Sequence, residues 1–312
     1  MRSMLVAAVV LVPIGCSAAP EPQCHAGADC VSGVCLGSGT CAPLSPGQDG
    51  GAEADDDAEP EESSSGQDAA AEELPDSTPS VCSPNHDGQI TRQETPLDAG
   101  LHATFKIATN AAVNTAGTDT GGVRTWDFSA DLPGDHLSLI ELQDLQGAWF
   151  APKFPSASYA SRLSDTQDLL GVFQLTDSQL LLLGVVSSTG GVSRTELVYD
   201  PPVVTLSFPL QQAATWTTDA KVTGLAMGIV SAYSEKYESQ VDAAGELIAP
   251  YGTFPVLRIQ TLLTRTVNMV PGTMRTFLFV TECFGTVASV SSNANEPQVE
   301  FTTASELKRL AP

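Results

Sequence analysis

Basic side chains are scarce in this chain of 312 residues, which has 14 Lys and Arg against 37 Asp and Glu. The net charge of −23 repels the phosphate groups of DNA and RNA, so we expect no nucleic-acid partner. Residues 42–80 contain 12 acidic residues and no Lys or Arg, and the remaining chain is near −11. Such a charge attracts cations, including Ca²⁺, weakly and without specificity.

Signature motifs of common enzymes are also missing. The chain has no nucleophile elbow, no His-Glu-x-x-His zinc helix and no Gly-rich phosphate loop. Its four histidines, at positions 25, 86, 102 and 136, are isolated in the sequence, and an isolated His is usually solvated. We therefore predict no enzyme and no catalytic residues, and keep a hydrolase without a recognisable motif as an alternative.

Long hydrophobic runs are absent beyond the N-terminus. Arg2 is followed by an apolar run from Met4 to Ile14, which is too short to span a bilayer and is typical of an export signal. The run ends in "VPIGC", which resembles the lipobox of bacterial lipoproteins, although that family prefers Leu where Pro13 stands. The resemblance implies cleavage before Cys16, acylation of its thiol and, with Ser17 next, sorting to the outer membrane. The alternative is an ordinary signal peptide cut elsewhere.

Seven cysteines leave one thiol unpaired, and acylation of Cys16 would leave six. Residues 24–41 hold four of them, separated by short Gly-rich loops, and predict a small knot with two disulfides of unassigned pairing. These four are Cys24, Cys30, Cys35 and Cys41. They resemble Cys-rich motifs that follow the anchor in some lipoproteins. A zinc site with His25 ranks below disulfides, because closely spaced Cys-x-x-Cys pairs are missing.

Residues 42–80 are rich in Gly, Ser, Pro and acid and poor in apolar side chains. Such a segment cannot bury enough surface to offset its chain entropy, so we expect a disordered acidic linker. As a flexible coil it would span roughly 35 Å, and charge repulsion would extend it. It would act as a tether.

The stretch "SPNHDGQITRQE", residues 83–94, resembles the calcium loop of EF-hand proteins. With Gly88 at the sharp turn, oxygen-bearing groups fall at the six ligand positions and Ile90 at the apolar position that pins the loop. The six expected Ca²⁺ ligands are Ser83, Asn85, Asp87, the carbonyl of Gln89, Thr91 and Glu94. Ser83 replaces the usual Asp, so the site would be weak, with a dissociation constant on the order of 10⁻⁴ to 10⁻³ M.

The same residues have a metal-free interpretation. Thr91 and Glu94 have the spacing of a capping box, and Asn85 with Asp87-Gly88 makes a tight turn. The helix that enters an EF-hand loop is missing, and Pro96 stops the exiting helix after about one turn. Both interpretations stay open at this point.

Two cysteines, Cys82 and Cys283, are left once the four in the knot pair locally. We predict a disulfide between them that ties the loop to the following domain. In the chain-entropy model, closing a loop of this size stabilises by on the order of 5 kcal/mol. The alternative is two separate thiols.

From residue 97 the pattern changes to short alternating runs bounded by Gly, Pro, Asn, Asp or Ser, typical of half-buried strands. Such runs cover residues 101–108, 136–142, 180–186, 194–199, 202–208, 229–241 and 256–266. Pro271-Gly272 predicts the turn of a hairpin that ends in residues 275–284. Residues 303–310 predict a short helix capped by Thr303 or Ser305. The fold class is all-β, a curved antiparallel sheet or an open barrel or sandwich.

Residues 207–224 and 241–259 resemble secreted and lipid-anchored β-rich bacterial proteins with curved sheets of the lipoprotein-carrier type. The residues that carry this resemblance are Phe208, Pro209, Leu210, Trp216, Gly252, Thr253, Phe254, Leu257 and Arg258. The resemblance names no catalytic residue. It implies that a curved sheet could enclose an apolar ligand, with residues 180–186 as apolar lining, although a buried sheet face explains that run equally well.

Together these features predict five parts: a signal segment (1–15), the lipid anchor with the Cys-rich knot (16–41), the linker (42–80), the EF-hand-like loop (81–96) and a β-rich domain (97–312). We expect a monomeric outer-membrane lipoprotein of the cell envelope, attached by its N-terminal lipid. Its expected role is binding or structural, with weak Ca²⁺ binding. The protein or apolar ligand is not identified, and carrying an apolar ligand is the alternative.

Overall fold

The computed structural model describes residues 82–312. The predicted signal segment, the anchor at Cys16, the four cysteines of the knot and the acidic linker lie outside the described residues. No helix within residues 82–312 is long and apolar enough to cross a bilayer.

Residues 82–312 form sixteen β-strands and no α-helix, which confirms the all-β prediction. The strands are β1 (Gln89–Ile90), β2 (His102–Ala112), β3 (Thr118–Thr120), β4 (Val123–Asp127), β5 (His136–Glu141), β6 (Tyr159–Arg162), β7 (Leu169–Leu175), β8 (Gln179–Ser187), β9 (Glu196–Ser207), β10 (Leu210–Gln211), β11 (Thr215–Ala226), β12 (Ile229–Ile248), β13 (Thr253–Val267), β14 (Val270–Thr281), β15 (Gly285–Ser292) and β16 (Thr303–Leu310). One 3₁₀ turn, η2 (Ala151–Lys153), precedes β6.

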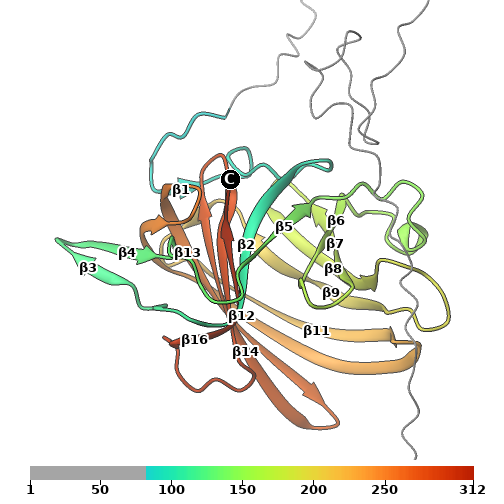
Figure 1. Cartoon of the computed structure of the whole chain (residues 1–312). Coiled ribbons are helices and arrows are strands. Elements are labelled where there is room, and N and C mark those ends of the chain that lie inside the picture. Colours follow the sequence, from blue (N-terminus) through green and yellow to red (C-terminus); the bar gives the residue numbers. More distant parts are fainter. Residues whose placement is uncertain (1–81) are drawn as a thin grey trace, which may run out of the picture. The chain divides into compact units, whose positions relative to one another are not determined.

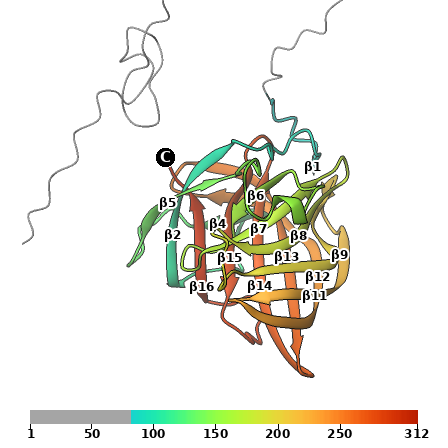
Figure 2. The same cartoon turned by 90° about the vertical axis from the view of Figure 1, so that its right-hand side faces the viewer.

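One large sheet dominates the domain, in the order β5-β2-β16-β15-β14-β13-β12-β11-β9-β8-β7-β6 with antiparallel neighbours. The sheet curves round on itself into a nearly closed, barrel-like wall (Figures 1 and 2). A β3–β4 hairpin projects from it, because β4 pairs in parallel with the end of β12. The short strands β1 and β10 form a separate pair at one end, which holds the EF-hand-like loop.

The two ends of the sheet meet mainly through side chains. Only one backbone bridge, between Gln143 and Ala160, joins the β5 end to β6 within the described residues. Beside it, Asp165 accepts a hydrogen bond from Ser138 Oγ at 2.8 Å and contacts His136 Nε2 at 2.5 Å. The gap between β5 and β6 is therefore held by an ionisable pair.

This pair makes the pKa of His136 testable. The hydrogen bond to Asp165 raises that pKa above its ordinary value. A raised folded-state pKa stabilises the fold below the unfolded pKa of about 6.5, and the gain is lost as pH rises through the folded value. Because the ring is half exposed, we expect less than about 1 kcal/mol. NMR titration of the imidazole should show the raised pKa, and Asp165→Asn should lower it.

The matched control is Asp131→Asn, which removes the same charge from a carboxylate that pairs with Lys106 instead. The raised pKa of His136 should survive that change. An equal drop of the pKa in both variants would mean that the general negative charge, and not Asp165, raises it.

Both faces of the central strands are buried. Val256 and Phe279 pack in one apolar cluster with Trp126, whereas Leu257 and Val280 pack in a second cluster on the opposite face. Two-sided burial explains why the sequence of β14 is an apolar run with no clean alternation. The second cluster includes Ile90 and Leu210 from the β1–β10 pair, so the loop covers part of the sheet.

The predicted C-terminal helix is wrong, because residues 303–310 form strand β16 between β15 and β2. The capping residues and the residue spacing of this segment fit a helix. A helix of only eight residues is weakly stable by itself, so pairing with the two neighbouring strands outweighs the helix propensity. The strand also gives its two basic residues partners: Lys308 Nζ donates to Leu163 O at 2.9 Å, and Arg309 Nη1 donates to Ala130 O at 2.8 Å.

The predicted hairpin exists, but its turn lies earlier than expected. β13 and β14 are joined through Asn268 and Met269, which have φ values of 48° and 67°. Positive φ at both central residues matches the twist of a two-residue hairpin, and Asn tolerates it well. Pro271 and Gly272 fall inside β14 instead.

The other strand predictions are confirmed, with two runs merged. Residues 101–108, 136–142, 180–186 and 229–241 correspond to β2, β5, β8 and the first part of β12. The runs 194–199 and 202–208 predict two strands separated by prolines. They form one strand, β9, that continues through Pro201 and Pro202.

Candidate functional site: the EF-hand-like loop and the aromatic pocket

The EF-hand-like loop brings together three of its six predicted ligands. Asn85 Nδ2 lies 2.8 Å from Glu94 Oε1 and 3.4 Å from Asp87 Oδ2. An amide thus stands between two carboxylates that would otherwise repel each other. These three side chains come from positions three, five and twelve of the loop, as the spacing predicts.

The other predicted ligands take supporting positions. Thr91 donates to Glu94 Oε2 through both its backbone N and its Oγ1, at 2.8 Å each. Gln89 donates its backbone N–H to Asp87 Oδ1 at 2.8 Å. Ser83 is exposed at the start of the loop. The contact of Thr91 with Glu94 is half of the alternative capping box, so the metal-free interpretation also has structural support.

The backbone turns sharply in the middle of the loop. Asp87 N–H donates to Asn85 Oδ1 at 2.9 Å, which is an Asx turn. His86 and Gly88 have φ values of 55° and 83°, and glycine takes the second of these without strain. The glycine position of the loop is therefore confirmed for a structural reason that does not need a metal.

A disulfide between Cys82 and Cys283, with Cα atoms 5.5 Å apart, fixes the loop to the β14–β15 turn and confirms the predicted bridge. Cys283 also donates its backbone N–H to Glu94 O at 2.7 Å. The carboxylate of Glu282 accepts the backbone N–H groups of Asn85 at 2.7 Å and His86 at 3.1 Å. The two ends of the loop are thus attached to one turn nearly 200 residues away in the chain.

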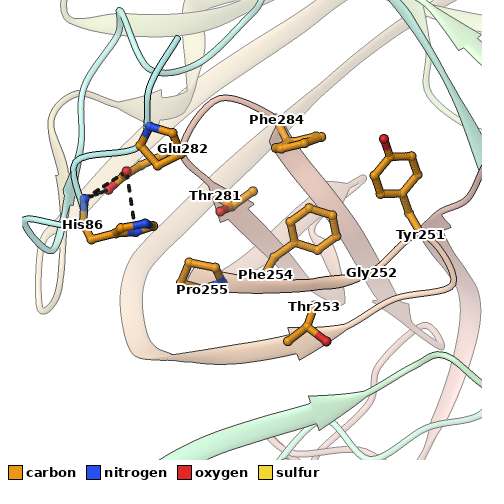
Figure 3. A pocket seen from close by; sticks show the side chains of 10 residues that line it. His86, Tyr251, Gly252, Thr253, Phe254, Pro255, Thr281, Glu282 and Phe284 are labelled. Atoms are coloured by element: carbon orange, nitrogen blue, oxygen red, sulfur yellow. Dashed lines mark hydrogen bonds and ion pairs between the residues drawn. The ribbon is translucent and has the colours of Figure 1, made fainter.

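An apolar pocket opens beside this attachment, with a volume of about 340 Å³. Figure 3 shows the rings of Tyr251, Phe254 and Phe284 grouped on one side of the pocket and His86 with Glu282 on the other. Ring centroids of Phe254 and Phe284 are 5.2 Å apart, and those of Tyr251 and Phe284 are 6.0 Å apart. Tyr251 and Phe284 are about half exposed, so their rings are available to a ligand.

The loop and the pocket share walls. Pro84 and His86 of the loop line the pocket, as do Glu282 and Phe284 on either side of Cys283. His86 Nδ1 is 3.9 Å from Glu282 Oε2. The loop therefore forms one wall of the pocket.

A second cavity of about 520 Å³ lies near the base of the β3–β4 hairpin. Polar residues dominate its lining, which includes Asp127 and Glu246. Neither cavity has the Leu and Val lining that the sequence suggested for a carrier.

Sequence reasoning missed the residues that attach the loop and line the pocket. Glu282, Tyr251 and Phe284 carried no motif, and only the position of Glu282 beside the bridge cysteine could have drawn attention to it. In residues 82–312 no three His, Cys, Asp or Glu side chains gather as a metal cluster. The loop offers a weaker set of ligands, two carboxylates and an amide.

A buried ion network was also missed. Arg258 is fully buried and holds Asp242 with two hydrogen bonds of 3.0 and 2.6 Å, and Glu300 at 2.7 Å. Burial alone would lower the pKa of Arg258, but hydrogen bonds to both carboxylates raise it overall. Its guanidinium carbon lies 4.4 Å from the ring centroid of Phe277. Arg258 thus links three separate chain segments.

No protein-family model and no curated protein matches the chain. Among solved structures, it is similar to a protein of Bacteroides fragilis described as exported and as having a YmcC-like fold. The identity is 8% and the TM-score 0.28, over 69% of this chain and 96% of that one. A likeness this distant carries no argument about the present protein.

Proposed function

We propose that this chain is a lipid-anchored cell-envelope protein that acts by binding, and that its EF-hand-like loop is a weak Ca²⁺ site. The observation that carries the metal proposal is the convergence of the Asp87 and Glu94 carboxylates on the amide of Asn85, at 3.4 and 2.8 Å. Lipid anchoring rests on the sequence resemblance at Cys16, a residue outside the described part of the chain.

The chemistry of the loop suits a hard cation. Ca²⁺ prefers carboxylate, amide and backbone carbonyl oxygens, which Asp87, Glu94, Asn85 and Gln89 provide. A bound ion would replace the amide N–H of Asn85 as the group that separates the two carboxylates. Two charges are few for a calcium site, so we propose millimolar affinity, suited to an extracellular or periplasmic concentration.

Attachment of the loop favours binding despite this low charge. The disulfide and Glu282 already hold the loop in its turn, so less chain entropy is lost when an ion arrives. The apolar residue Ile90 is buried against the sheet at the position where the resemblance requires it. These features support a preformed site.

A second candidate function is uptake of a small apolar group in the aromatic pocket. Its volume of about 340 Å³ is at the lower end for small-molecule sites. Three aromatic rings offer stacking surfaces. This pocket replaces the Leu- and Val-lined cavity as the place where an apolar ligand would bind. The pair of His86 and Glu282 does not favour a hydrolase. The Glu282 carboxylate already accepts the backbone N–H groups of Asn85 and His86, which gives it a structural role.

Isothermal titration of the purified full chain with CaCl₂ tests the metal proposal. We expect saturable heat with one site and a dissociation constant on the order of 10⁻⁴ to 10⁻³ M. The double variant Asp87→Ala, Glu94→Ala should lose that heat, because only the amide and carbonyl oxygens remain.

The matched control removes two exposed carboxylates elsewhere, Glu141→Ala and Asp177→Ala, and keeps the loop. It should bind like the wild type. Equal heats in both double variants would mean that the domain binds Ca²⁺ only through its general charge. Absence of saturable heat in the wild type up to about 10 mM would remove the site, since extracellular modules bind below that concentration.

A further inference from the structure

Two long hairpins end in exposed apolar residues. The β11–β12 hairpin turns at Met227, followed by Ile229 and Val230, and the β13–β14 hairpin turns at Met269 and Val270. Their exposed fractions are 78%, 71%, 82%, 92% and 69% in that order. Large apolar side chains this exposed are unusual when they occur together, and they mark interaction surfaces.

A third segment joins the first hairpin. Gly228 donates its backbone N–H to Arg194 O at 2.9 Å, which brings the β8–β9 connection against this turn. That connection carries Val192, which is 92% exposed. We call Val192, Met227, Ile229, Val230, Met269 and Val270 the apolar tips.

The apolar tips lie at one end of the sheet. Strands β11, β12, β13 and β14 are consecutive neighbours, and both turns close their hairpins at the same end of these strands. Figures 1 and 2 show the β13–β14 hairpin extending below the rest of the wall, and Figure 1 shows the β11–β12 hairpin ending at the right-hand side, apart from it. The β1 end, where residue 82 enters, lies away from the β13–β14 turn.

The segments that form the apolar tips contain no acidic residue. Residues 82–312 hold 23 acidic and 13 basic side chains, yet residues 178–195, 220–234 and 247–281 hold no Asp or Glu. These three segments include every apolar tip and both flanks of each turn. They do carry Arg194 and Arg275. Glu196 lies beside this end but pairs with Arg194 at 2.8 Å, so the tips themselves carry no acidic side chain and suit a partner with an apolar interior.

We propose that the apolar tips dock into the surface of a phospholipid bilayer. Methionine, isoleucine and valine side chains would enter the boundary between headgroups and acyl chains, while the arginines stay at phosphate level. Trp149 lies beside the β8–β9 connection with the Arg194 guanidinium 5.8 Å from its ring centroid, and Trp favours the membrane interface.

Two separate protruding tips fit a bilayer better than a protein. Stable protein interfaces have one contiguous apolar core with a polar rim, whereas these tips project independently. The proposed anchor adds a second reason and rests on the proposed function. The predicted knot and linker lie between Cys16 and Cys82, and the linker alone spans roughly 35 Å as a flexible coil. The domain would therefore stay close enough to the bilayer for weak contacts to form repeatedly.

The test measures binding to vesicles of phosphatidylethanolamine and phosphatidylglycerol by co-sedimentation. It uses the processed chain that starts at Ser17, so neither leader nor acyl group contributes. We expect this chain to bind, and the variant with Met227, Ile229, Val230, Met269 and Val270 all replaced by Ser to bind at least about tenfold more weakly, because the apolar area that enters the bilayer is lost. Circular dichroism and thermal unfolding verify that the variant is folded.

The matched control replaces Leu137 and Leu139 by Ser, two leucines on β5 that are each 61% exposed. Their vesicle binding should match the wild type. Equal binding by the tip variant, or no binding by the wild type, would overturn the proposal. So would a concentration-dependent dimer that the tip substitutions abolish without any vesicle binding, since the tips would then pair copies of the chain. Failure of acylation, read from the intact mass of the exported protein, would leave this result unaffected.

Discussion

Replacing both Cys82 and Cys283 by Ser is expected to lower the free energy of unfolding by about 3–5 kcal/mol. The bridge closes 201 residues of chain, so its loss frees nearly the whole described domain in the unfolded state. The folded state loses one attachment of the EF-hand-like loop as well, and the remaining ones are Glu282, the backbone N–H of residue 283, the β1–β10 pair and the burial of Ile90. Guanidinium unfolding followed by tryptophan fluorescence measures the change.

The double replacement is a cleaner test than adding a reductant, which would also act on the cysteines predicted to pair in residues 24–41. Calcium titration of the double variant gives an independent reading. If the bridge preorganises the loop, the affinity should fall together with the stability, whereas the heat should keep its stoichiometry. An unfolding midpoint equal to that of the wild type would show that the disulfide does not contribute to the stability of the domain.

Replacing Arg258 by Leu is expected to cost about 3–5 kcal/mol of stability, because Asp242 and Glu300 would be left facing each other without their cation. The side chain is 1% exposed, so water cannot easily take its place. It also donates to Thr115 O, which accepts the indole N–H of Trp126 at 2.8 Å. Replacing Arg258 would therefore also weaken the attachment of the segment around Thr115, which holds Trp126 in the first apolar cluster.

Two further variants separate charge from shape. Arg258→Lys keeps the charge but cannot hold Asp242 with two bonds, and it should fall between wild type and Leu. The control Arg162→Leu removes an Arg that is about half exposed and lies 3.9 Å from the carboxylate of Asp165. It should lower the free energy of unfolding by less than about 0.5 kcal/mol. Denaturant unfolding of all three decides. A Leu variant as stable as the Arg162 control would mean that the network is replaceable by apolar packing.

Local pattern was enough to predict most of the strands. β2, β8 and β13 are predicted from runs of apolar and β-branched residues bounded by turn residues, since a strand that is buried on at least one face must show such a run. Counting cysteines and their parity predicted the 82–283 bridge. The spacing of residues 83–94 predicted both the sharp turn at Gly88 and the approach of Asn85, Asp87 and Glu94. These are short-range features, fixed by the conformations that each residue tolerates.

Local pattern failed where a neighbour in space made the decision. Residues 303–310 carry helix capping signals, yet a strand lies on either side, and the pairing of β16 with both outweighs a helix of two turns. The β13–β14 turn lies at Asn268-Met269 because the register between Thr266 and Pro271 requires a tight connection there, although Pro-Gly is the stronger turn signal in isolation.

The sequence alone thus determined the class of fold, the disulfide between residues 82 and 283, and the order of oxygen-bearing groups in the loop, because these depend on residue type, parity and spacing along the chain. Only the folded domain decided that Glu282 would hold the loop, that Tyr251, Phe254 and Phe284 would form a pocket beside it, and that two acid-free hairpin tips would share one end. Those features join residues from distant strands. Their positions depend on sheet curvature and register, which arise from the packing of all strands together.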